Sequence, residues 1–311
     1  MAGSTSLIAA IEAGGTKFNC AVARADPSGT SAGEILAETR IETTQPEPTL
    51  QAVAEFFSEA QAAHGSIATI GIGTFGPVDL NPASPTWGWI TSTPKPGWEN
   101  TALAPFFQQR FGVPVAFDTD VNAAVLAERW HGAGLDQDPL VYVTIGTGVG
   151  GGVWANGGLV HGLIHPEIGH LHVPAPEFSQ ALRPEGACPF HSSCVEGYVC
   201  GPALAKRWGV PANQLSADSP AWREAAEVLA YLCLNLTCTL SPGRIILGGG
   251  VMEQPQLLPL VQQSFVTQLN GYLRHPRYAE EVAQYIVKPG LGGRAGLVGA
   301  LELARTELRR A

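Results

Sequence analysis

The sequence predicts an α/β protein made of two similarly built halves, and three observations support this prediction. A strand, a glycine-rich turn and a second strand follow one another at residues 6–24 and again at 139–155. After each of these hairpins, apolar strand patterns alternate with helical ones, which is typical of α/β folds. No linker or low-complexity segment divides the 311 residues.

Composition and charge exclude several classes of protein. Apolar residues make up 45% and charged residues 14% of the chain, as in folded proteins rather than disordered ones. The formal net charge of −9 provides no general attraction to nucleic acid or to an anionic membrane, so we expect neither as a partner. No window reaches a transmembrane length without charges or glycines.

The N-terminal residues and the cysteines indicate a reducing compartment. The first residues, MAGSTSLIAAIEAGG, lack the positive region of a secretory signal, and their apolar run stops at Glu12. Six cysteines are few for this length, which favours a cytoplasmic protein. Four of them lie in apolar contexts and are expected to be buried thiols: Cys20, Cys200, Cys233 and Cys238.

The first half begins with the hairpin of residues 6–24. Its turn presents the backbone N–H groups of Gly14, Gly15 and Thr16 beside Lys17, and such a nest suits a phosphate. The Walker A spacing is absent and no helix follows, so a plain hairpin turn remains an alternative.

A third strand, a helix and a fourth strand follow the hairpin. We expect strands at residues 34–43 and 68–80, the second of them ending in a Gly/Pro loop. Between them, residues 46–65 predict a helix, because Leu50 and Phe57 fall on one apolar stripe.

Residues 82–100 are rich in Pro, Trp and Thr and are long for a structureless loop, which indicates a binding loop. Its tryptophans are expected to pack the loop rather than to stack on a sugar face; they are Trp87, Trp89 and Trp98. The loop ends at Asn100, which we include among the candidate substrate-binding residues.

A short helix at 103–112 leads to a strand at 113–118 and a helix at 120–132. Asp118 and Asp120 stand at this strand-to-helix switch, where ligands bind in open α/β sheets. One of the two acids is expected to cap the helix, which leaves the other for chemistry.

The second hairpin repeats the design of the first. Gly146, Gly148 and Gly151 satisfy the G-x-G-x-x-G pattern, but a strand follows where the dinucleotide fingerprint requires a helix. We therefore reject a Rossmann site and predict a second phosphate-binding hairpin. Two such hairpins, one in each half, can hold the phosphates of ATP from two sides of a cleft.

The stretch from residue 166 to 196 contains PEIGH and then CPFHSSCVEG. Cys188, His191 and Cys194 are three residues apart, and His170 is a possible fourth partner. Thiolate and imidazole suit tetrahedral Zn²⁺, and four protein ligands leave no open position, so the zinc would be structural. A disulfide between the two cysteines and a merely polar loop are the alternatives.

The remaining elements of the second half are read from apolar periodicity and from Gly and Pro positions. Residues 242–251 predict a strand whose triple-glycine exit would let a ligand approach the backbone closely. The other expected elements are helices at 195–209, 220–240, 256–273 and 295–311 and a strand at 285–290.

Several motifs in a fixed order resemble those of the ROK family of sugar kinases and repressors, and more closely its bacterial fructokinase branch. They are IEAGGTKF, GTFGPVD, TSTPKPGW, DTDVNAA, TIGTGVGGG, HPEIGH, CPFHSSCVEG and ILGGGV. The resemblance covers nearly the whole chain. It implies an actin-like (ribonuclease H-like) ATPase fold, with two α/β domains around a cleft and a zinc-binding loop. We expect a small domain of residues 1–118 plus 296–311 and a larger one of residues 119–295.

The resemblance also implies a role for each candidate residue. Asp120 would be the general base that accepts the proton of the sugar hydroxyl. Glu167, His170 and Glu196 would contact the sugar, and His170 would also bind zinc. The ATP-binding residues implied are Gly14, Gly15, Thr16, Lys17, Thr147, Gly148, Gly248 and Gly249. The zinc ligands implied are His170, Cys188, His191 and Cys194.

The expected reaction is transfer of the γ-phosphate of ATP to the 6-hydroxyl of a hexose, with D-fructose as the first choice. Glu12 stands where family glucokinases carry Asp and would help to hold Mg²⁺ through water. Thr119 replaces the Asn that precedes the base in glucokinases, which favours fructose over glucose. The alternatives are a kinase for mannose, glucose or an amino sugar, and a sugar sensor without catalysis.

Three further expectations follow, and the first of them rests on the resemblance alone. The protein is expected to be a homodimer, and the early first strand leaves no room for the helix-turn-helix domain of the ROK repressors. Loss of zinc is expected to harm sugar affinity before it harms ATP binding, because the hairpins that bind ATP lie elsewhere in the sequence.

Overall fold

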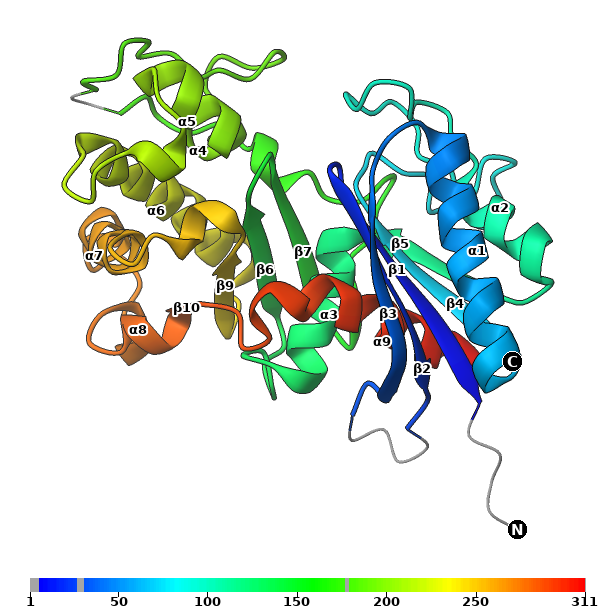
Figure 1. Ribbon diagram of the computed structural model, residues 1–311. Coiled ribbons are helices and arrows are strands. Elements are labelled where there is room, and N and C mark those ends of the chain that lie inside the picture. The colour runs from blue at the N-terminus through cyan, green and yellow to red at the C-terminus, as the bar shows by residue number, and fades with distance from the viewer. Residues whose placement is uncertain (1–5, 27–30, 177–178, 311) are drawn as a thin grey trace. The chain divides into compact units, whose positions relative to one another are not determined.

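The structure is a computed structural model that describes residues 6–26, 31–176 and 179–310 (Figure 1). Its contacts divide the chain into two compact units. The first unit comprises residues 1–131, 159–165 and 294–311, and the second comprises residues 132–158 and 166–293. By these contacts the helix at 120–131 groups with the first unit, whereas the division expected from the sequence begins the second domain at residue 119.

The elements of the first unit alternate between strands and helices. Its strands are β1 (Leu7–Ala13), β2 (Lys17–Arg24), β3 (Glu34–Glu42), β4 (Ile67–Thr74) and β5 (Val115–Thr119). Its helices are α1 (Pro46–His64), α2 (Leu103–Phe111), α3 (Asp120–His131) and α9 (Ala295–Leu308).

The second unit contains the rest of the helices and strands. Its strands are β6 (Leu140–Ile145), β7 (Val149–Ala155), β9 (Arg244–Gly248) and β10 (Ile286–Val287), and β8 (Gly158–Leu159) follows β7 at the boundary of the two units. Its helices are α4 (Val195–Val199), α5 (Gly201–Trp208), α6 (Pro220–Leu240), α7 (Leu257–Leu269) and α8 (Val282–Tyr285). Short 3₁₀ turns include η1 (Ile168–His170).

The first unit is built on a five-stranded sheet of order β3-β2-β1-β4-β5. The strands β1, β2 and β3 are antiparallel, and β4 and β5 run parallel to β1. Alternate residues of β1 supply two cores because side chains of a strand point to opposite faces. Ile11 lies in the core with α1 and α2, whereas Ile8 packs with Leu297 of α9, and α3 covers α9 (Figure 1).

The second unit repeats this scheme in a sheet of order β10-β9-β6-β7-β8. The strand β6 pairs antiparallel with β7 and parallel with β9, just as β1 pairs with β2 and β4. The helix α6 packs against both α4 and α7 (Figure 1). The repeated design predicted from the two hairpins is therefore present as two mixed α/β sheets.

The helix expected at residues 195–209 is wrong as a single element. It is broken at Cys200, whose backbone is extended with φ −66° and ψ 158°. Pro202 explains the break, because proline has no N–H to donate and its ring collides with the carbonyl four residues earlier. The break separates α4 from α5 and frees the N–H of Gly201 for a contact described below.

Two smaller expectations also need correction. Cys238 is exposed, whereas Cys20, Cys200 and Cys233 are buried as expected. The last strand, expected at 285–290, is only the two residues of β10. Among the described residues, no helix is long and apolar enough to cross a bilayer.

Candidate functional site

The turn between β1 and β2 lies at the end of the first unit's central hairpin. Gly14 N donates to Lys17 O (2.9 Å), which closes the turn, and Thr16 is exposed at its tip. Thr43, the residue after β3, supports the turn twice: its Oγ1 donates to Gly14 O (2.8 Å) and its N donates to Thr16 O (3.1 Å). A side chain at Gly15 would meet no atom within 4 Å, so the backbone there is open to a ligand.

Glu12 lies one residue before the end of β1, beside this turn. Its Oε2 accepts from Asn19 Nδ2 (2.7 Å), and Gly296 of α9 leaves the room that the carboxylate occupies. Burial raises the pKa of Glu12, although the Asn19 bond and the charge of Lys17 act in the opposite direction. A half-buried carboxylate beside a phosphate-type turn fits Mg²⁺, which takes one or two carboxylates and fills the rest with water and phosphate oxygens.

Asp120 is the first residue of α3, directly after β5. The helix cap is neither of the two acids predicted: Thr119 Oγ1 accepts from Asn122 N (3.1 Å), as a Ser or Thr cap does. Asp118 is buried instead, and its Oδ1 accepts from Thr119 N (2.8 Å) and Asn122 Nδ2 (2.7 Å). Asp120 is half-buried, and its Oδ1 accepts from Val121 N (2.9 Å).

The turn between β6 and β7 is the second unit's counterpart of the first turn. Gly146 N donates to Gly148 O (2.9 Å), and Thr147 is exposed at the tip. A strand follows, as predicted, so the glycine pattern is part of a hairpin and not of a dinucleotide-binding βαβ unit.

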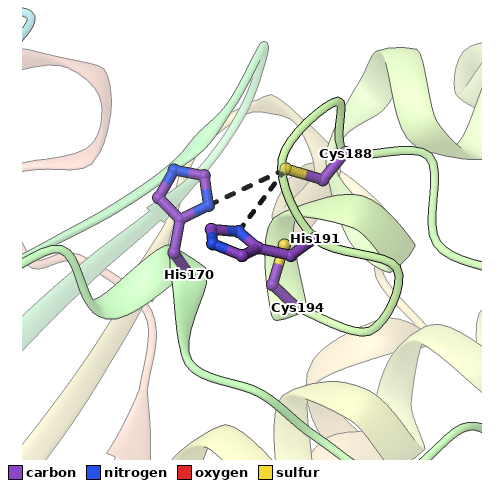
Figure 2. A group of neighbouring side chains, drawn as sticks. All are labelled: His170, Cys188, His191 and Cys194. Atoms are coloured by element: carbon purple, nitrogen blue, oxygen red, sulfur yellow. Dashed lines mark hydrogen bonds between the residues drawn. The ribbon is translucent and has the colours of Figure 1, made fainter.

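The Cys/His residues predicted from the sequence come together in the second unit. Figure 2 shows the side chains of His170, Cys188, His191 and Cys194 in one cluster, with His170 contributed by η1 and the other three by the loop before α4. One ligand atom from each lies within 4.8 Å of all the others. Cys188 Sγ is 4.0 Å from His170 Nδ1 and 3.8 Å from His191 Nδ1. Both cysteines are free thiols, so the predicted disulfide alternative is not formed.

These separations fit one zinc ion. Zn–S and Zn–N bonds of about 2.3 and 2.1 Å place neighbouring ligands of a tetrahedron roughly 3.6 Å apart, close to the distances in the cluster. Burial raises the pKa of the Cys194 thiol to about 11, and the neighbouring Cys188 adds to the rise. A bound cation would reverse this effect, because it favours the thiolate.

The metal-type cluster is packed directly on the second turn. Gly169 of η1 lies so close to β7 that a Cβ on it would be 1.8 Å from Val149 O. Glu196 Oε2 accepts from Val149 N (2.9 Å), while its Oε1 is 3.9 Å from His170 Nε2. Gly201 N, freed by the break between α4 and α5, donates to Gly146 O (2.8 Å).

Close packing requires glycine at the end of β9, at Gly248 and Gly249. A Cβ on Gly248 would be 2.7 Å from the Tyr142 hydroxyl, and Gly249 has φ +90° with Ile145 O only 2.4 Å from its Cβ position. Larger residues would therefore displace the backbone at the end of β6. These contacts explain the glycines without a ligand, and their role with adenosine stays a prediction.

Two of the predicted sugar-binding residues lie at the surface. Glu167, the residue before η1, and Asn100, at φ +57° in the long loop, are both exposed. Trp98 of that loop is fully buried and donates from Nε1 to Thr44 O (2.8 Å), so it packs the loop as expected.

Sequence reasoning missed three polar contacts. His161 Nε2 lies 2.9 Å from Asp118 Oδ2, and His172 Nδ1 lies 2.9 Å from Ser193 Oγ beside the Cys/His cluster. The third is the Glu196–Val149 bond. No spacing rule predicts pairs that are 21 to 47 residues apart.

Comparison with known proteins identifies the family. The model of the ROK family matches residues 8–307. A fructokinase of Zymomonas mobilis is 42% identical over 94% of this chain and 95% of its own length. A fructokinase of Pediococcus pentosaceus is 39% identical over 98% of this chain and 100% of its own.

A solved structure agrees with the sequence matches. The ROK family glucokinase of Streptomyces griseus, in complex with glucose and AMPPNP, superposes with a TM-score of 0.74 at 26% identity, covering 97% of this chain and 100% of that one. The two mixed α/β sheets are thus those of the ROK kinases, with their actin-like ATPase fold. Matches of this extent show that the chain belongs to the ROK family.

Proposed function

We propose that this protein is a fructokinase that transfers the γ-phosphate of ATP to the 6-hydroxyl of D-fructose. The observation that carries the proposal is the near-complete alignment with two fructokinases at 39% and 42% identity. The glucokinase relative solved with glucose and AMPPNP supports a hexose and ATP as the two substrates. Thr119, in place of the Asn expected in glucokinases, favours fructose.

Asp120 is the proposed general base. It accepts the proton of the 6-hydroxyl as that oxygen bonds to the γ-phosphorus and the bond to the β-phosphate bridging oxygen breaks, which yields sugar phosphate and ADP. Its place supports this role: it follows β5 at the carboxyl end of parallel strands, where ligands of α/β sheets bind. The Thr119 cap and the buried Asp118 hold the backbone on which it stands.

The two glycine turns and the residues near them are proposed to bind the two substrates and Mg²⁺. The turns at Gly14–Lys17 and Thr147–Gly148 bind the phosphates of ATP through backbone N–H groups, and Gly248 and Gly249 approach the adenosine. Glu167, His170, Glu196 and Asn100 contact the hexose. Glu12 holds Mg²⁺ through water, and that ion neutralises phosphate charge when it is bound.

The Cys/His cluster is proposed as a structural zinc site. When bound, zinc would supply a rigid centre and no reacting water, because four protein ligands complete its tetrahedron. His170 then has two tasks. Its Nδ1 belongs to the ligand set, and its Nε2 faces Glu196 and is available to a sugar hydroxyl.

A coupled assay of ADP release with fructose, mannose, glucose and N-acetylated amino sugars tests the function. We expect the largest kcat/KM with fructose, because specificity is a difference in transition-state binding. A larger kcat/KM with another sugar would identify that sugar, rather than fructose, as the preferred substrate. Sugar binding by calorimetry without turnover on any sugar would instead indicate a sensor.

Asp120→Asn tests the base. The amide has nearly the same shape but cannot accept the proton, so we expect a folded protein that binds fructose and loses kcat by about 10²–10⁴-fold. A kcat near that of the wild type would contradict the assignment.

A further inference from the structure

His161, from a distant part of the chain, contacts Asp118, two residues before the proposed base Asp120. Residues 159–165 belong to the first unit by their contacts, although the residues on both sides of them belong to the second. Two histidines fasten this segment. His165 is buried and its Nε2 accepts from Val78 N (3.1 Å) in the loop after β4, while His161 Nε2 lies 2.9 Å from Asp118 Oδ2 at the end of β5.

Asp118 is the centre of a network that surrounds Asp120. One carboxylate oxygen binds Thr119 N and the Asn122 side chain, and the other faces His161. Thr119 in turn caps the helix at Asn122 N. Asp118 thus holds the backbone of Thr119 and the side chain of Asn122, which lie on either side of Asp120 in the chain. The backbone of Asp120 therefore has little freedom to move.

Loss of the His161 side chain would remove a hydrogen-bond partner from the buried carboxylate of Asp118. Asp118 is only 4% exposed, and a buried carboxylate that loses a partner has to recover a hydrogen bond from water or from its neighbours. The Asp118 hydrogen bond raises the pKa of His161, against the effect of burial. The neighbours that Asp118 would recruit are those that hold the start of α3.

We propose that His161 is a positioning residue for catalysis: through Asp118 it fixes the strand-to-helix turn that presents Asp120. The proposal rests on the proposed function for its effect on turnover. The rigidity of the strand-to-helix turn at Thr119–Asn122 is a separate consequence, and it can be measured without an activity assay. His161 is not assigned any contact with the sugar or with ATP.

A matched pair of amide variants tests the proposal. In His161→Gln, the side-chain nitrogen can occupy the place of the imidazole Nε2 and donate to Asp118, whereas the shorter side chain of His161→Asn cannot. We expect the Asn variant to lose kcat by roughly tenfold or more, because small misplacements of a reacting group are costly. We expect the Gln variant to recover most of this loss. The KM for ATP should stay within about twofold in both variants. His64→Ala, an exposed histidine at the end of α1, is the surface control.

Hydrogen exchange of the Thr119 and Asn122 amides provides the second readout. Both amides should exchange faster in the Asn variant than in the wild type, the Gln variant and the His64→Ala control. Equal kcat and equal exchange in all four proteins would overturn the proposal, and so would a Gln variant that is no better than the Asn variant in both. A wild-type protein that phosphorylates no hexose would refute the proposed function instead, and the exchange rates would still decide the role of His161.

Discussion

The two glycine turns look alike in the sequence but are supported differently. In the first unit, the turn at Gly14–Lys17 is held by Thr43, a residue that follows the neighbouring strand β3 of the same sheet. In the second unit, the turn at Gly146–Gly148 is held by Glu196 of α4 and Gly201 of α5, the two helices that follow the loop with three residues of the Cys/His cluster.

This difference changes what each turn depends on. The first turn depends on its own sheet, so its geometry should survive changes in the Cys/His loop. The second turn shares Glu196 with the proposed sugar-binding residues and lies against Gly169, next to the proposed ligand His170. The expectation that zinc loss harms sugar binding before ATP binding stays a prediction. From the packing of the second turn against the cluster, we expect that ATP binding would be affected as well.

The largest effect is expected from Gly169→Ala. The added Cβ would be 1.8 Å from Val149 O and cannot be accommodated by a side-chain rotation, because the obstacle is backbone. We expect a loss of about 3 kcal/mol in the free energy of unfolding, measured by urea denaturation. Gly158→Ala is the control, because its Cβ would meet no atom within 4 Å. Equal stability of the two variants would show that η1 is not pressed against β7.

Removal of bound metal with a chelator should separate the two turns. We expect the Val149 amide, which donates to Glu196, to exchange roughly tenfold faster or more, since hydrogen bonds to charged groups contribute about 1.5–3 kcal/mol. The Thr43 amide, which supports the first turn, should change little. Affinity for AMPPNP should fall together with affinity for fructose. If the sugar affinity fell alone and Val149 stayed protected, the second turn would be independent of the metal.

A smaller effect is expected from Gly148→Ala compared with Gly15→Ala. The Cβ at residue 148 would be 2.7 Å from Glu196 Oε2, so the carboxylate must move and its bond to Val149 N weakens. We expect a loss of about 1–2 kcal/mol in fructose binding by calorimetry. At residue 15 the Cβ enters open space, and fructose binding should be unchanged. Equal losses in the two variants would contradict the coupling through Glu196.

The smallest effect concerns the charge beside the first turn. Burial raises the pKa of Glu12, so the folded state disfavours its ionised form, and this cost appears as the pH rises through the raised pKa. Glu12→Gln should therefore have a slightly higher Tm than the wild type at pH 8, with the difference shrinking toward pH 4. Thermal melts across this range measure it. A Tm difference that grows as the pH falls would have the wrong sign for a raised pKa.

The Cys/His cluster shows how much of the site was predictable. The sequence predicted Cys188, His191 and Cys194 from their spacing and His170 as a fourth partner, and the structure brings one ligand atom of each within 4.8 Å of the others. The strand-to-helix switch at Asp120 was also predicted. The helix cap was not, because Asp118, Thr119 and Asp120 are all good caps by residue type and only the packing of Asp118 against His161 assigns the role to Thr119.

The sequence by itself determined the two hairpins, the alternation of strands and helices, and the four metal-type ligands. These follow from local patterns: apolar periodicity, glycine at tight turns and short ligand spacing. Only the tertiary structure decided which segments support each turn. The Glu196–Val149 bond joins residues 47 apart and the His161–Asp118 contact residues 43 apart. Such pairs depend on how the chain returns to a sheet, and that path is set by the packing of whole elements rather than by any local pattern.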